Sequence, residues 1–175
     1  MADRLAILIH HITTLSEPDQ LGMTKIAKIV WLSDVESYRR TGKTISGGDD
    51  YIKDEHGPRH RKLYSAVESL KKRSALAERP TLTGIGKVRR ELVPLELPDV
   101  SCFSADEIVI VDRITSAICK MSAKEASDLT HDELWKAATF SERIPVAAAA
   151  PVEGGLTPEI RQWAEAAIDA ESPAT

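Results

Sequence analysis

Residues 23–40 read MTKIAKIVWLSDVESYRR, and this stretch decides the fold. Its apolar side chains cover most of the circumference of a helix instead of forming one stripe. A helix that is apolar on nearly all sides belongs in the middle of a domain, where other elements can cover it. We predict that it ends at Thr41-Gly42, because glycine commonly terminates helices. Asp34 lies within this apolar helix, and a buried carboxylate needs a partner, so we predict a structural hydrogen bond there.

Spacing of apolar residues places further elements around this central helix. Residues 3–15 carry apolar side chains three and four positions apart, which is typical of an amphipathic helix. Residues 43–56 are polar and contain a glycine pair, so we expect a loop with one short strand. Gly57-Pro58 predicts the start of a third helix, since proline fits the first helical turn. Two alternating runs separated by glycines predict a small β-hairpin over about residues 80–93.

Three Ser/Thr-x-x-Glu motifs follow in the second half of the chain. In such a capping box the hydroxyl and the carboxylate satisfy backbone N–H groups that the first helical turn leaves free. Each motif stands just before a run of apolar residues, so each predicts a helix. The motifs and the helices that they predict are Ser104–Glu107 with 105–121, Ser122–Glu125 with 123–129, and Thr130–Glu133 with 131–138.

The composition changes at Ile144, where a stretch rich in alanine, proline and glycine shows no periodicity. We therefore predict three parts: a domain over residues 1–143, a linker over 144–156, and a C-terminal helix and tail over 157–175. The expected fold class is α+β and mostly α. Five or six helices would pack around the central apolar helix, beside the small hairpin.

Composition excludes several classes of protein. The apolar fraction of 42% and the charged fraction of 29% are ordinary for a globular chain. No stretch approaches the ~20 apolar residues that span a bilayer. The two cysteines provide no disulfide framework, which fits a reducing compartment, and we expect a cytoplasmic protein.

No motif for catalysis or metal binding stands out. His10 and His11 are adjacent and would point about 100° apart on a helix, and Gly57-Pro58 separates His56 from His60. The chain has no nucleophile elbow, no phosphate loop and no paired cysteine motif. We therefore expect no cofactor, no metal and no enzymatic activity. An enzyme of unrecognised type, built around Asp34, Tyr38 and His131, is a third functional hypothesis after the two given below.

Charge is unevenly distributed along the chain. Residues 53–90 hold 11 Lys or Arg against 4 Asp or Glu, whereas residues 91–175 hold 6 against 16. A DNA-binding autoregulator that uses the basic segments 59–73 and 87–90 is therefore the alternative function. A low overall pI and sparse aromatic residues count against it. Basic and acidic elements that pack side by side and neutralise each other would also explain the pattern.

Five short motifs occur in a recognisable order. Gly57-Pro58 and the Thr-His-x-x-x-Trp element at 130–135 are the most telling. Together the motifs resemble the Panacea domain, the SocA-like antitoxin family of bacterial toxin–antitoxin systems and prophages, over about residues 5–140. The chain departs from the family at 29–32, where Ile-Val-Trp-Leu replaces a Leu-Leu-Tyr-like core. In chain order the motifs are 23–34, 38–47, Tyr51-Ile52, His56-Gly57-Pro58 with Leu63-Tyr64, and 130–135.

The resemblance implies an antitoxin that binds and neutralises a cognate protein toxin by protein–protein contact. It does not identify the toxin, because such antitoxins are matched with toxins of unrelated types. A rigid helical core with variable loops suits this role, and we expect the contact surface on loop 43–57 and the basic helix face behind it. Trp135 could instead be a core anchor with His131 as its hydrogen-bonded neighbour. The candidate contact residues are Lys43, Tyr51, His56, Arg59, Arg61, Lys62, His131 and Trp135.

The C-terminal segment suggests a second activity. An antitoxin can sequester its toxin or act as an adaptor that delivers it to an ATP-dependent protease. A tail from Pro145 onward would suit such a tether, with Ile160 and Trp163 as anchors. This hypothesis rests on composition alone.

Overall fold

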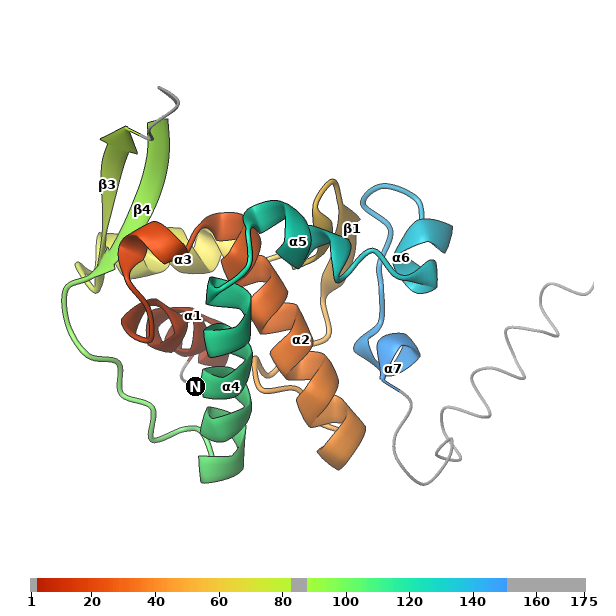
Figure 1. The fold of residues 1–175 in the computed structure, drawn as a ribbon. Helices are drawn as coiled ribbons and strands as arrows, with labels where there is room; N and C mark the ends of the chain where they lie inside the picture. The colour runs from red at the N-terminus through yellow and green to blue at the C-terminus, as the bar shows by residue number, and fades with distance from the viewer. Residues whose placement is uncertain (1–2, 83–87, 151–175) are drawn as a thin grey trace, which may run out of the picture.

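A long helix, α2, lies at the centre of the fold (Figure 1). The computed structural model describes residues 3–82 and 88–150, in which seven α-helices and two antiparallel two-stranded sheets form a mostly helical α+β architecture. Fold class and central helix are as predicted, with more and shorter helices than expected. The elements are α1 (Arg4–Thr14), the 3₁₀ turn η1 (Pro18–Gln20), α2 (Met23–Thr41), β1 (Tyr51–Asp54), β2 (Gly57–His60), α3 (Leu63–Lys72), β3 (Leu76–Leu82), β4 (Val88–Pro94), α4 (Ala105–Cys119), α5 (Ala123–Asp128), α6 (Glu133–Ala137) and α7 (Val146–Ala149).

Helix α2 is surrounded by packed elements, which explains its unusual composition. Helices α1, α4, α5 and α7 and strand β2 all contact it. Its side chains Ile26, Ile29 and Val30 are completely buried. The helix ends as predicted: Gly42 adopts a left-handed conformation (φ 69°), and its N–H donates to the Tyr38 carbonyl at 2.8 Å.

The segment after Gly57 is a strand, so the prediction of a helix start at Gly57-Pro58 is wrong. Strands β1 and β2 pair antiparallel, with Tyr51 opposite His60. Gly57 has φ 103°, and a Cβ there would overlap the Thr130 hydroxyl and lie 2.5 Å from Lys28 Nζ. This tertiary crowding demands glycine at a turn, and α3 begins only at Leu63.

The second hairpin confirms the prediction for residues 80–93 and extends it towards the N-terminus. Strands β3 and β4 pair in register from Leu76 opposite Pro94 to Leu82 opposite Val88. Figure 1 shows this hairpin projecting from the helical body.

Two of the three predicted capping boxes are present, and the third is wrong. The hydroxyls of Ser104 and Ser122 each accept from the backbone N–H three residues further on. In turn, the carboxylates of Glu107 and Glu125 accept from the backbone N–H of Ser104 and Ser122. The third helix, α6, is instead capped by Asp132, whose carboxylate accepts from Trp135 N at 2.8 Å. Thr130 is buried, and its hydroxyl donates to the Ser127 carbonyl at the end of α5. The hydroxyl is therefore not available as a helix cap.

Residues 144–150, which we expected to begin the linker, pack into the core. Ile144 and Val146 are buried, and the N–H of Ile144 donates to the Tyr51 carbonyl at 2.9 Å. Helix α7 lies against α2 (Figure 1). The remaining linker residues and the predicted helix and tail at 157–175, with Ile160 and Trp163, lie outside the described residues, so the three-part division of the chain stays a prediction.

Candidate partner-binding surface

The loop between α2 and β1 is fastened to the core by Asp34. This carboxylate is fully buried; Oδ1 accepts from Ser46 N at 2.9 Å, and Oδ2 accepts from the Tyr51 hydroxyl at 2.6 Å and from the Ser46 hydroxyl. Burial raises the pKa of Asp34 to about 6, although these hydrogen bonds act in the opposite direction. The structural hydrogen bond predicted for Asp34 is present, and it makes the loop a rigid part of the domain.

Tyr51 supports this loop from within. Its side chain is fully buried, with its ring edge-on to Trp31 at 4.8 Å and to His60 at 5.1 Å. Burial and the neighbouring Asp34 raise the pKa of the Tyr51 hydroxyl well above its usual value. Tyr51, a candidate contact residue, therefore lies where a partner cannot touch it directly, and it positions the residues that a partner can reach.

The basic candidate contact residues differ in whether they already form ion pairs within the protein. Arg59 forms an ion pair with Asp54 and lies over the Tyr64 ring at 4.8 Å, so it fastens β2 and α3 together. Arg61 is paired with Asp50 at 3.1 Å. Lys43 and Lys62 are exposed, and no ion pair reaches either from the described residues. Among the candidate contact residues, these two lysines are the cations most available to a partner.

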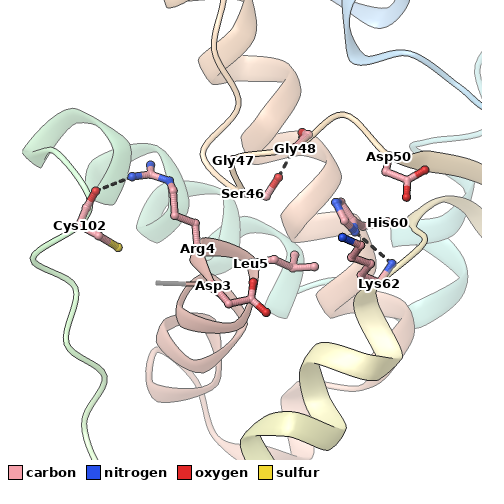
Figure 2. Close-up of a pocket in the computed structure, with 10 residues that line it drawn as sticks. All are labelled: Asp3, Arg4, Leu5, Ser46, Gly47, Gly48, Asp50, His60, Lys62 and Cys102. Atoms are coloured by element: carbon pink, nitrogen blue, oxygen red, sulfur yellow. Dashed lines mark hydrogen bonds between the residues drawn. The ribbon is translucent and has the colours of Figure 1, made fainter. Parts of the chain in front are cut away.

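A cleft of about 460 Å³ lies where the start of α1, the Ser46–Gly48 loop and the start of α3 meet (Figure 2). Lys62 is the one residue of the predicted contact set that lines it. Arg4 forms one wall and is heavily engaged: it donates to the Ile45 carbonyl at 2.9 Å and to Glu107 at 2.7 Å, and also to the Cys102 carbonyl. His60 forms another part of the lining.

The sequence did not indicate Arg4, and it suggested a role for His60 only as a metal ligand. His60 lies in strand β2, and the helix expected to start at Gly57-Pro58 obscured its position. Nothing in the local sequence marks Arg4, because its partners are 41 to 103 residues away in the chain.

The remaining candidates lie at a different site. His56 and His131 line a separate hollow of about 280 Å³ beside α5. His131 precedes the cap of α6, and its ring stacks on Trp135 at 3.8 Å with an interplanar angle of 11°. Trp135 Nε1 donates to the Asp54 carbonyl at 3.2 Å, and Lys53 Nζ lies 4.3 Å from the ring centre. Trp135 therefore anchors α6 to β1, and stacking joins it to His131. The predicted contact set is divided between two places.

A buried lysine of α2 forms a hydrogen bond with the β1–β2 hairpin. Lys28 is 1% exposed, and its Nζ donates to the Pro58 carbonyl at 3.1 Å. Burial lowers the pKa of Lys28 to about 7, and the nearby Asp54 counteracts this only in part. The sequence did not indicate Lys28, since a lysine on a helix usually has its charged end at the surface.

The basic segments proposed for DNA binding are partly neutralised within the fold. Glu91 accepts from Arg79 at 2.9 Å and from Arg89 at 2.8 Å, and these contacts lower its pKa to about 2. Glu78 is paired with Lys71 and with Arg90 in the same way. The surplus positive charge of this region is therefore smaller on the surface than in the sequence.

Neither a metal site nor a membrane-spanning helix is found among the described residues. In residues 3–82 and 88–150, no group of three or more His, Cys, Asp or Glu side chains is arranged to hold a metal ion. Over the same ranges, no helix is both long and apolar enough to cross a membrane.

The fold and these surfaces define a mostly helical α+β protein with a rigid loop presented beside a central apolar helix. A family model described as "Antitoxin SocA-like, Panacea domain" matches residues 26–136, well over half of the chain. The protein belongs to this SocA-like Panacea antitoxin family, as its motifs predicted. No curated protein and no solved structure matches the chain.

Proposed function

We propose that this protein is an antitoxin that binds a cognate protein toxin and neutralises it by direct contact, without catalysis or a cofactor. Family membership is the observation that carries the proposal. The matched residues 26–136 contain most of α2, the Asp34-fastened loop and the start of α3. A preorganised loop loses little conformational entropy on binding, which favours tight association.

The toxin-binding surface that we propose is centred on Lys43, Arg61 and Lys62. These side chains are exposed, whereas Tyr51 is fully buried and Arg59 is paired with Asp54. Exposed cations of this kind accelerate encounter with an acidic partner and contribute to specificity. His56, His131 and Trp135 would form a second, separate contact area. We expect the protein to act in the cytoplasm.

Co-expression with the product of the neighbouring gene tests this proposal. The wild-type protein should restore growth to cells that express a toxic neighbour, and the two should co-purify. The double variant Lys43→Glu/Lys62→Glu should lose both properties while keeping its melting temperature, because both lysines are exposed and unpaired among the described residues. Lys72→Glu, an exposed change at the far end of α3, is the matched control and should behave as wild type. A toxic neighbour that neither binds nor is neutralised would exclude the proposal.

Delivery of the toxin to an ATP-dependent protease is the finer hypothesis, with Ile160 and Trp163 as anchors. The truncation that tests it should begin at residue 151, because Val146 and Ala150 are buried and belong to the core. If the tail acts as a tether, this truncation should lengthen the toxin's lifetime in cells without weakening binding. An unchanged lifetime would exclude the adaptor role and leave neutralisation by binding in place.

DNA binding is the second candidate function, supported by the exposed Lys72 and Arg73 at the C-terminal end of α3. Its weakness is that Glu78 and Glu91 engage the arginines of the β3–β4 hairpin. A salt series with promoter DNA distinguishes the two functions. Phosphate contacts would give an affinity that falls steeply with salt and a Lys72→Glu variant that binds more weakly.

A further inference from the structure

We propose that the cleft in Figure 2 binds a carboxylate of a partner polypeptide, held between the His60 imidazole and the Lys62 ammonium group. The inference goes beyond toxin binding, because it names the chemistry that the cleft recognises whatever protein supplies it.

The orientation of the buried His60 side chain is the first observation. His60 is 4% exposed, and its Nδ1 accepts a hydrogen bond from the Lys62 backbone N–H at 3.2 Å. An imidazole that accepts at Nδ1 carries its proton at Nε2. Among the described residues no hydrogen bond reaches Nε2, and Figure 2 shows the ring between Gly48 and Lys62 at the cleft. This N–H is therefore available to donate to a ligand that enters the cleft.

The Gly48 backbone leaves room beside that donor. A Cβ at Gly48 would lie 3.4 Å from His60 Nε2, in van der Waals contact, so a longer side chain there could cover the nitrogen. The adjoining Ser46 is fastened to Asp34 through both its N–H and its hydroxyl. The donor and the opening beside it are therefore already in place before a ligand arrives.

Within the cleft, the surroundings of Lys62 favour a single negative charge on the ligand. Four charged side chains line it, and the cation Arg4 and the anion Asp50 are already paired, with Glu107 and Arg61 respectively. Lys62 is the cation without an ion pair among the described residues, whereas Asp3 contributes an opposing carboxylate. One available cation beside a neutral donor suits a carboxylate, and the two aspartates would repel a phosphate dianion more strongly.

The cleft is larger than one carboxylate, so flanking peptide residues can enter with it. The carboxylate could come from an aspartate or glutamate side chain or from a chain terminus. The chemistry at His60 and Lys62 is the same for both sources, and they differ in the neighbouring peptide group.

Nuclear magnetic resonance of the full-length protein with short peptides tests the inference. The probes are acetyl-Gly-Asp-Gly-amide, acetyl-Gly-Gly-Gly with a free carboxylate, the neutral acetyl-Gly-Asn-Gly-amide, and inorganic phosphate. We expect at least one carboxylate peptide to shift the His60 Nε2 resonance saturably at roughly millimolar concentration, and the neutral peptide to leave it unchanged. The carboxylate peptide that binds more tightly identifies the source.

Paired variants of His60 separate the ligand contact from folding. His60→Asn keeps an acceptor for the Lys62 N–H and removes the inward donor, whereas His60→Gln restores an N–H near the Nε2 position. We expect His60→Asn to weaken peptide binding about tenfold and His60→Gln to weaken it less. The exposed change Lys62→Met keeps the side-chain stem and should also weaken binding about tenfold, with an unchanged melting temperature.

Three results would overturn the inference. They are the absence of any shift with both carboxylate peptides, an equal shift with the neutral peptide, and tighter binding of phosphate than of either carboxylate. Each of these can be obtained without a toxin, so failure here is distinguishable from failure of the antitoxin proposal.

Discussion

Replacement of Asp34 by asparagine should change how stability depends on pH. The folded protein raises the pKa of Asp34 from 3.8 to about 6, because burial disfavours the carboxylate more than its hydrogen bonds stabilise it. Between these two values the folded state binds more protons at this site than the unfolded state. Its contribution to stability is therefore complete below pH 3.8 and is lost as the pH rises through 6.

The magnitude follows from linkage. With these two pKa values, the free energy of unfolding of the wild type should fall by about 2 kcal/mol relative to Asp34→Asn between pH 4 and pH 7. The asparagine oxygen can still accept from Ser46 N, and the hydroxyls of Ser46 and Tyr51 can turn to accept from its amide. The variant should therefore fold and show no corresponding pH dependence.

Urea denaturation followed by tryptophan fluorescence measures this difference, since Trp31 contacts Tyr51 directly. Comparing wild type with Asp34→Asn at each pH cancels the titration of all other groups. Tyr51→Phe is the matched control: it removes one of the hydroxyl donors to Asp34 but keeps the carboxylate, so its pH dependence should persist. Parallel curves for wild type and Asp34→Asn would refute the reasoning, because they would mean that the carboxylate has the same pKa folded and unfolded.

Three further changes have expected outcomes. Between pH 7 and pH 9 the free energy of unfolding of the wild type should rise by about 2 kcal/mol relative to Lys28→Met. Burial lowers the pKa of Lys28 to about 7, so in this range the unfolded state binds a proton at this site that the folded state has lost. The same pH dependence in both proteins would contradict this. Gly57→Ala should cost about 2 kcal/mol or more by thermal unfolding, since φ is 103° and the Cβ would overlap neighbours. Gly22→Ala, which has open space around its Cβ but replaces the N-cap of α2, should cost less, about 1 kcal/mol. Ser104→Ala should cost about 1 kcal/mol in urea, because it removes the cap of α4, and a loss below a few tenths would deny the cap.

Prediction from the sequence succeeded where the signal is local. The apolar run of 23–40 marked α2, and the Ser104 and Ser122 motifs marked the starts of α4 and α5. A helix cap is made within four residues and apolar periodicity within a few turns, so neighbours in the chain suffice to specify both. The motif at Thr130 failed because a tertiary neighbour, the end of α5, had already engaged its hydroxyl.

The candidate site was harder to predict, because it depends on which side chains are buried. Tyr51 and Lys62 look equally suitable as contact residues in the sequence, yet one is fully buried and the other exposed. His56 and His60 are only four residues apart in the sequence, yet they line different hollows. Burial is a property of the assembled elements, and no local pattern around these residues states it.

The sequence by itself determined the central helix, the hairpin at 80–93, two helix caps and the family, because each depends on short-range periodicity or on the order of short motifs. Only the tertiary structure decided that Gly57 begins a strand, that Asp34 fastens the Ser46 loop, and that His60 directs a free donor into a cleft. These features join residues 12 to 73 positions apart, and long-range packing selects among conformations that are locally almost equal in energy.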